Sequence, residues 1–241
     1  MPARIVALCR EAWRTLAELF ANQAWRRIAF FLLPYAGVLL GLDVAAHYGA
    51  VTDAPLPAQF FISKDEGFGE YLEYALLAAT AIMLALMWRR TGAGIYLVNA
   101  LLFAYLTADD SLQFHERFGH MVAPVMPQGT PLPGNDLGEV LLFGLVGVTW
   151  LASLLVALRR ADLRPATHAL ILAFGVVGAG FFGIFADAAT SWGDKSAALV
   201  EFHAWFEDGG EFLMIIATFL AATAIFDTER RRPALGEPAA S

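Results

Sequence analysis

The chain has 241 residues, of which 58% are apolar and 16% charged, with a mean hydropathy of +0.57. Soluble domains contain about 45–50% apolar and about 25% charged residues, so an ordinary soluble domain is excluded. The formal charge of −7 excludes a basic nucleic-acid-binding face, and the single cysteine excludes disulfides within the chain and Cys-rich metal sites.

Residues 1–27 are predicted to form an amphipathic helix on the cytoplasmic membrane surface. Leu8, Ala12, Leu16 and Leu19 recur at helical spacing, and arginines and glutamates occupy other positions around the helix. The apolar run that follows is too long for the core of a signal peptide and has no nearby small-residue cleavage site. We therefore expect this N-terminal part to be retained as an anchor.

Six apolar segments follow, and each is long enough to cross a membrane as a helix. Strands of a membrane barrel would be about half as long and would alternate in polarity. The sequence therefore predicts an all-α, polytopic membrane protein with a transmembrane domain over residues 28–228 and a flexible cytoplasmic tail over residues 229–241. The predicted spans are 28–48, 69–88, 94–115, 138–158, 167–190 and 208–227.

Basic residues indicate the orientation of the spans. All but three of the 16 Lys and Arg residues flank one set of helix ends, and only Lys64, Arg117 and Lys195 fall on the opposite side. The positive-inside rule then places both termini in the cytoplasm. The location that we expect is a bacterial inner membrane, with the acidic side facing the periplasm.

Three segments of the chain share one plan: acids, a Gly-Glu pair, an apolar span and then basic residues. The pairs Gly69-Glu70, Gly138-Glu139 and Gly210-Glu211 begin the second, fourth and sixth spans. This internal repeat predicts three helical hairpins, at about 28–90, 93–160 and 165–230. Chance similarity competes with it, because helix-start acids and positive-inside charges produce part of the pattern in any membrane protein.

Acids at the outer ends of the spans are the candidate functional residues. A carboxylate in hydrocarbon costs several kcal/mol unless a cation, water or a proton neutralises it. We predict one outer-leaflet site that binds one or two divalent cations, with Glu116 and Glu73 as proton carriers in catalysis. The predicted metal ligands are Glu70, Asp110, His115, Glu139, Asp187 and Glu211.

The identity of the cation is open. Imidazole beside carboxylates suits Mn, Fe or Zn, whereas carboxylates alone suit Ca or Mg. The chain has no Glu-x-x-His and no His-Glu-x-x-His, so the prediction rests on composition and position. Among the other histidines, His47 is expected to form an interfacial hydrogen bond, His203 to be solvated and His168 to have no functional role.

Three functions fit these features. The first is a metal-dependent membrane enzyme that acts on a lipid or another small substrate. The second is a cation or proton transporter or channel, against which the inner halves of the spans offer no continuing ionisable residues. The third is a non-catalytic subunit of a larger membrane complex, with other membrane subunits as partners. No nucleotide is expected, because the phosphate-binding glycine motifs are absent.

Overall fold

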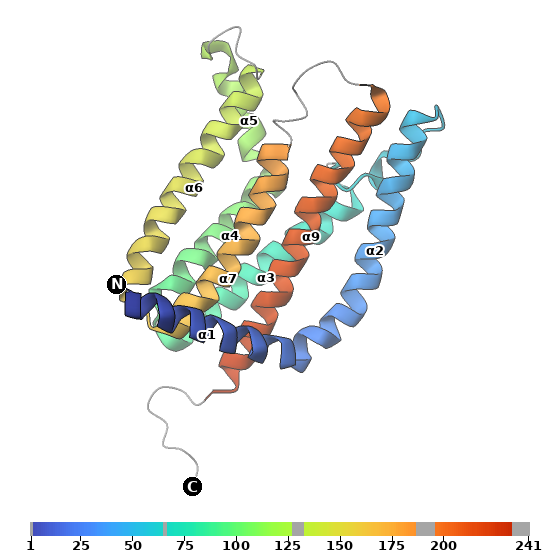
Figure 1. The fold of residues 1–241 in the computed structure, drawn as a ribbon. Helices are drawn as coiled ribbons and strands as arrows, with labels where there is room; N and C mark the ends of the chain where they lie inside the picture. The colour runs from blue at the N-terminus through green and yellow to red at the C-terminus, as the bar shows by residue number, and fades with distance from the viewer. Residues whose placement is uncertain (1, 65–66, 127–132, 187–195, 233–241) are drawn as a thin grey trace.

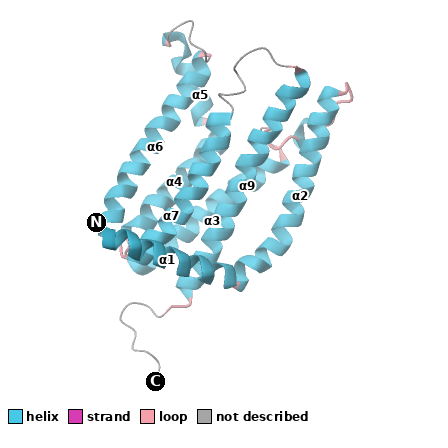
Figure 2. Ribbon diagram, in the orientation of Figure 1, coloured by secondary structure: helices cyan, strands magenta, loops and turns pink. Residues whose placement is uncertain are grey.

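The computed structural model describes residues 2–64, 67–126, 133–186 and 196–232. Within these ranges the regular elements are all helical, which confirms the all-α prediction (Figures 1 and 2). The long helices are α1 (Pro2–Ala21), α2 (Gln23–Val51), α3 (Phe68–Thr91), α4 (Gly94–Leu112), α5 (Phe114–Val122), α6 (Gly134–Arg160), α7 (Leu163–Gly180) and α9 (Ala197–Arg230). Three short elements are η1 (Ala58–Phe60), η2 (Ala123–Val125) and the π-helix η3 (Phe181–Ala186).

In the part of the chain that the structure describes, five helices are long and apolar enough to cross a membrane: α2, α3, α6, α9, and α7 with its extension to Gly183. The predicted third span does not qualify. Its helix, α4, ends at Leu112 instead of residue 115 and contains Asn99, Asp109 and Asp110. Asn99 and Asp109 are fully buried, so these polar residues of α4 face other helices, whereas Leu101 on the same helix is 62% exposed.

The helices form a bundle, and α1 lies across one end of it (Figure 1). We call this the α1 end and the opposite one the far end. The helix α3 packs mainly on α4, and α9 packs on α2, α3 and α7. The contact of α2 with α3 is slight, because α2 packs chiefly on α9. The predicted arrangement of three repeated hairpins is therefore not confirmed by the packing.

Close packing between α7 and α9 depends on small residues. A Cβ atom on Gly175 would lie 1.9 Å from Thr218 Oγ1 of α9, and one on Gly178 would lie 2.2 Å from Met214 Cε. Without glycine at these positions the two helices could not approach so closely. Small residues have this role in membrane helix bundles, where the lipid is as apolar as the side chains and contact area drives association.

The N-terminal helix α1 is held to the bundle by charge. Arg164 at the start of α7 donates hydrogen bonds to Glu18 of α1 (2.7 Å) and to Glu229 of α9 (2.6 Å). Thr15 and Leu19 of α1 are buried, whereas the exposed stripe of the helix consists of Val6, Trp13 and Phe20. Large exposed apolar residues on one face are what the prediction of a membrane-surface helix requires. The acids Glu11 and Glu18 of α1 form ion pairs with Arg164 of α7.

The ion pair between Glu18 and Arg164 makes docking of α1 sensitive to pH. The hydrogen bond from Arg164 lowers the pKa of Glu18 below its usual 4.5, against an opposing effect of burial. A carboxyl group with a lowered folded-state pKa contributes stability above its unfolded pKa and loses it as the pH falls through the folded one. The wild type should therefore melt at a higher temperature than Glu18→Gln at about pH 6, and the difference should shrink progressively as the pH falls below the usual pKa of 4.5. A difference that stays constant over this range would contradict the role of the pair.

Candidate functional site

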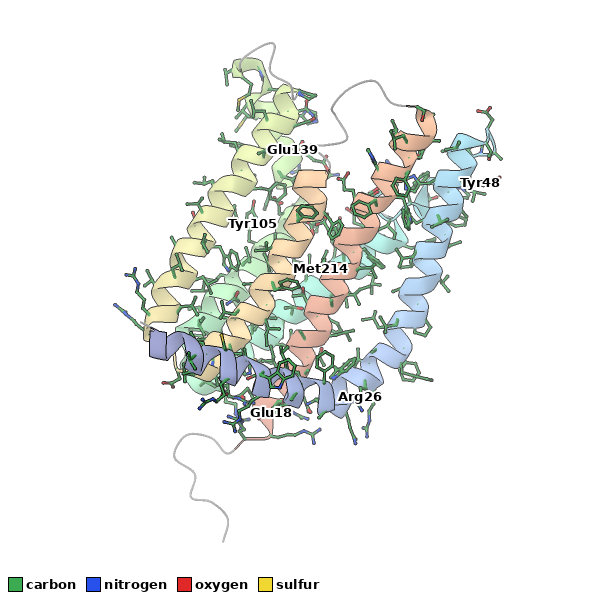
Figure 3. The ribbon with its side chains drawn as sticks, in the orientation of Figure 1. Glu18, Arg26, Tyr48, Tyr105, Glu139 and Met214 are labelled. Atoms are coloured by element: carbon green, nitrogen blue, oxygen red, sulfur yellow. The ribbon has the colours of Figure 1, made fainter. Side chains whose placement is uncertain are left out.

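A cavity of about 430 Å³ lies in the far half of the bundle, between α3, α4, α5, α6, α7 and α9. It brings together every site residue predicted from the sequence except Asp187, which lies outside the described residues. These side chains come from five helices, and Figure 3 shows Glu139 among them near the far end of α6. The residues are Glu70 and Glu73 of α3, Asp110 of α4, His115 and Glu116 of α5, Glu139 of α6 and Glu211 of α9.

The cavity is polar at one end and apolar at the other. Most of its acids lie near the far ends of their helices and Glu211 lies near the middle of α9, whereas deeper residues such as Leu77 and Phe103 are apolar. Along α6 the lining runs from Glu139 to Trp150, which is about 16 Å at 1.5 Å per residue. No Lys or Arg occurs among the described residues that line the cavity. Among the described lining residues, six carboxyl groups therefore share this space with one histidine.

The sharp turn between α4 and α5 positions His115. Gln113 adopts a left-handed conformation with φ of 53°, which ends α4. The buried carboxylate of Asp109 then accepts hydrogen bonds from the backbone N–H of His115 (3.1 Å) and from its Nδ1 (3.0 Å). This leaves Nε2 as the other ring nitrogen, 3.9 Å from Glu116 Oε1. The ring also packs on Phe143 of α6, with centroids 5.0 Å apart.

Electrostatics around His115 favour a positive charge. Burial alone lowers the pKa of His115, but the hydrogen bond and negative charge of Asp109, with smaller effects of Glu139 and Glu116, raise it on balance above the usual 6.5. A carboxylate that holds one nitrogen of a histidine fixes the orientation of the ring. The same pairing is common around metal-bound histidines, where the second nitrogen is the ligand.

The three Gly-Glu pairs have similar surroundings. A Cβ atom on Gly69 would lie 2.9 Å from the Ile62 backbone, one on Gly138 2.8 Å from Gly119, and one on Gly210 2.2 Å from the Phe182 ring. Ile62 lies in the connection between α2 and α3, Gly119 in α5, between α4 and α6, and Phe182 in η3, between α7 and α9. In all three pairs, the glutamate that follows lines the cavity.

Two further glycines make room for the carboxylates. Gly183 lies under Glu211, because a Cβ atom there would be 2.2 Å from Glu211 Oε2. Gly119 lies against Glu139, whose Cγ would be 2.9 Å from an added Cβ. Glu139 and Glu211 therefore fit only because α5 and η3 have glycine, without a side chain, at positions 119 and 183.

A ready-made metal site is not present in the described part of the chain, where no three His, Cys, Asp or Glu residues form a group that could hold an ion. The acids face one cavity without converging on one point. The donor set itself suits a cation, since carboxylate oxygens and one oriented imidazole are ligands for Mn, Fe or Zn.

Outside the cavity, His47 forms the hydrogen bond expected of it. Its Nδ1 lies 2.6 Å from Glu201 Oε2 of α9, and its Nε2 lies 3.5 Å from Asp43 Oδ1. Asp43 is fully buried and also accepts a hydrogen bond from the backbone N–H of Ile62 (3.0 Å). These contacts join α2, α9 and the connection before α3, so His47 has a structural role.

Sequence reasoning missed a group of buried polar residues nearer the α1 end. Tyr96 Oη lies 2.8 Å from Nδ1 of His168, a fully buried residue for which the sequence predicted no functional role. Trp150, at the inner limit of the cavity, donates through Nε1 to Asn99 Oδ1 (3.4 Å). The single Asn within an apolar span was the signal available in the sequence.

The chain belongs to a family described as a domain of unknown function (DUF8692), which it matches over residues 61–226. The matched part includes α3 to α7 and nearly all of α9, and so every helix that lines the cavity. No curated protein and no solved structure matches the chain.

Proposed function

We propose that this protein is a membrane-embedded enzyme whose cavity binds a divalent cation and acts on a lipid or another small substrate. The observation that carries the proposal is the convergence of seven acidic or histidine side chains from five helices on one cavity. Catalytic sites are usually concave, with a few polar groups set in apolar walls, and this cavity has that composition.

Charge supports binding of a cation. Six carboxyl groups in a half-buried space repel one another unless protons or cations neutralise them. Among the described lining residues there is no Lys or Arg to do so, and His115 can supply at most one positive charge. A divalent cation suits this site, because one ion offsets two negative charges and can be bound by several carboxylates.

We assign the roles as follows. Glu70, Asp110, Glu139 and Glu211 provide carboxylate ligands and His115 provides Nε2, with Asp187 as a further ligand. A divalent cation held there would supply Lewis-acid catalysis. Glu73 and Glu116 remain to carry protons, and Glu116 is the more accessible, with 39% of its side chain exposed.

The same proposal includes the membrane topology. We infer six spans, with α4 as the sixth, and the α1 end in the cytoplasm, because the Arg-rich helix ends gather there. The cavity then opens toward the periplasmic side of a bacterial inner membrane. The three Gly-Glu pairs have similar surroundings, which supports descent of the chain from a triplicated hairpin. This holds although α2 packs on α9 and not on α3, its partner in the first predicted hairpin.

Calorimetric titration of the purified protein with Mn²⁺ or Zn²⁺ tests the proposal. We expect saturable binding of one or two ions and a rise in melting temperature that EDTA reverses, because a ligand bound only by the folded state stabilises it. Absence of saturable binding for all the divalent ions tried, Mn²⁺, Zn²⁺, Fe²⁺ and Ca²⁺, would refute it.

Asp109 gives a second measurement of the same site. The substitution Asp109→Asn keeps the shape of the side chain but weakens its hold on His115 Nδ1. We expect about tenfold weaker binding of Mn²⁺ or Zn²⁺, the lower end of the range for partners of metal ligands. The matched control is Asp53→Asn, which changes an exposed acid after α2 and should leave the affinity unchanged.

One observation favours a transporter as a second candidate. Asn99, Tyr96 and His168 extend buried polar groups from the inner limit of the cavity toward the α1 end, contrary to the expectation that the inner halves are without ionisable residues. Proteoliposomes that show proton or Mn²⁺ flux, lost in His168→Phe, would support transport. Binding without flux would leave the enzyme as the function.

A further inference from the structure

The inner half of the cavity has no use in binding a cation. Below the acids, its walls are formed by Leu77, Leu102, Phe103, Phe143, Val146 and Ile215. This apolar part continues to Trp150 and Thr218, near the middle of their helices. An apolar space of this kind binds apolar groups, because a polar ligand would lose its hydrogen bonds there.

The cavity reaches the side of the bundle between α6 and α7. These two helices each pack on α4 and hardly touch one another, and α4 is visible between them in Figure 1. Val177 of α7 lines the cavity and is also 62% exposed, so it stands at the edge of an opening. Since both helices are candidate membrane spans, the opening faces the hydrocarbon of the bilayer.

Glycines on both sides of this opening leave it unobstructed. Residues 139, 143, 146, 147 and 150 line the cavity from one face of α6, and residues 176, 179, 180 and 183 do so from one face of α7. Gly147 and Gly180 belong to these faces, and an added Cβ at either would meet nothing within 4 Å. The space in front of both glycines is therefore open.

We propose that the substrate is a single-chain amphiphile with a cationic head, which enters from the bilayer between α6 and α7. Its chain occupies the apolar inner half, and its head lies at the acids, where the described lining provides six carboxyl groups and no Lys or Arg to complement a positive charge. The inference rests on the proposed function, in that it takes the cavity as the substrate site, and it adds the class of substrate.

Quenching of Trp150 by a brominated amphiphile tests the proposal. Of the five tryptophans that the structure describes, only Trp150 lines the cavity, and the other five of the six in the chain are replaced by Phe. The protein, in phosphatidylcholine nanodiscs with EDTA, is titrated with 11-bromoundecylamine. We expect saturable quenching, and at least tenfold weaker binding of 11-bromoundecanoate, because the acids repel a carboxylate head.

Filling the cavity provides the decisive comparison. In the same background, Gly147→Phe and, independently, Gly180→Phe should abolish the saturable quenching. The matched control is Gly144→Phe, one turn earlier on α6, where the glycine is exposed, does not line the cavity and has no neighbour within 4 Å of an added Cβ. Quenching that does not saturate, or that both filling variants leave intact, would overturn the amphiphile site. Equal binding of the amine and the carboxylate would overturn the cationic head.

Titration of the Gly147→Phe variant with Mn²⁺ separates this inference from the proposed function and shows that the variant is folded. Gly147 lies two turns below Glu139, so binding of Mn²⁺ should persist while the amphiphile is excluded. Binding of Mn²⁺ by a wild type that shows no saturable quenching would refute the amphiphile alone. Saturable quenching without binding of any divalent ion would refute the cation site alone.

Discussion

Replacing Glu211 by Gln is expected to weaken binding of Mn²⁺ or Zn²⁺ at least 100-fold, equivalent to about 2.7 kcal/mol. The carboxylate of Glu211 lines the cavity directly and packs on Gly183, where no side chain intervenes. Gln keeps the shape and one carbonyl oxygen but loses the charge, and the affinity of carboxylate sites depends strongly on their number of charges. Calorimetric titration of both proteins measures the effect.

The control is Glu207→Gln, one turn earlier on the same helix. Glu207 is half-buried but does not line the cavity, so its substitution should change the affinity less than threefold. Thermal stability without cations gives an independent measurement. Glu211→Gln should melt at an equal or higher temperature than the wild type, because it removes one of six crowded carboxyl groups. Equal affinities of the two variants for cations would exclude Glu211 as a ligand.

Replacing Gly175 by Val is expected to lower the free energy of unfolding by about 3 kcal/mol. This is the upper end of the usual cost of inserting a larger side chain into a well-packed interior. The added Cβ would lie 1.9 Å from Thr218 Oγ1, which itself donates a hydrogen bond to the Met214 carbonyl oxygen (2.6 Å). Because Gly175 is buried and the clash involves a short side chain, α7 and α9 would have to separate. Unfolding of the protein in detergent measures the loss.

Gly144→Ala is the matched control for this effect. Gly144 lies within α6 and has nothing within 4 Å of an added Cβ, so alanine there should stabilise the helix by roughly 0.5–1 kcal/mol. The two substitutions are therefore expected to act in opposite directions. Equal stability of Gly175→Val and the wild type would show that α7 and α9 do not depend on this close contact.

Most residues of the candidate site could be predicted from the sequence, because a charged side chain in the hydrocarbon of a membrane is energetically costly. Acids inside apolar helices must face the bundle interior or water, so membership in the site followed from residue type and position in the span. Glu70, Glu139 and Glu211 were found in this way, and all three line the cavity. The role of Asp109 was not predicted, because its partner His115 is reached only through the left-handed turn at Gln113.

By itself, the sequence determined that the chain is helical, that most of its helices suit a membrane and that acids gather at one set of helix ends. These properties follow from composition and local order along the chain, which act on each helix separately. Only the tertiary structure decided that α2 packs on α9 instead of α3, and that α6 and α7 stand apart around an apolar space. Such choices depend on contacts between residues distant in sequence, like Gly175 with Thr218, and in lipid no simple pattern of polarity determines which helices meet.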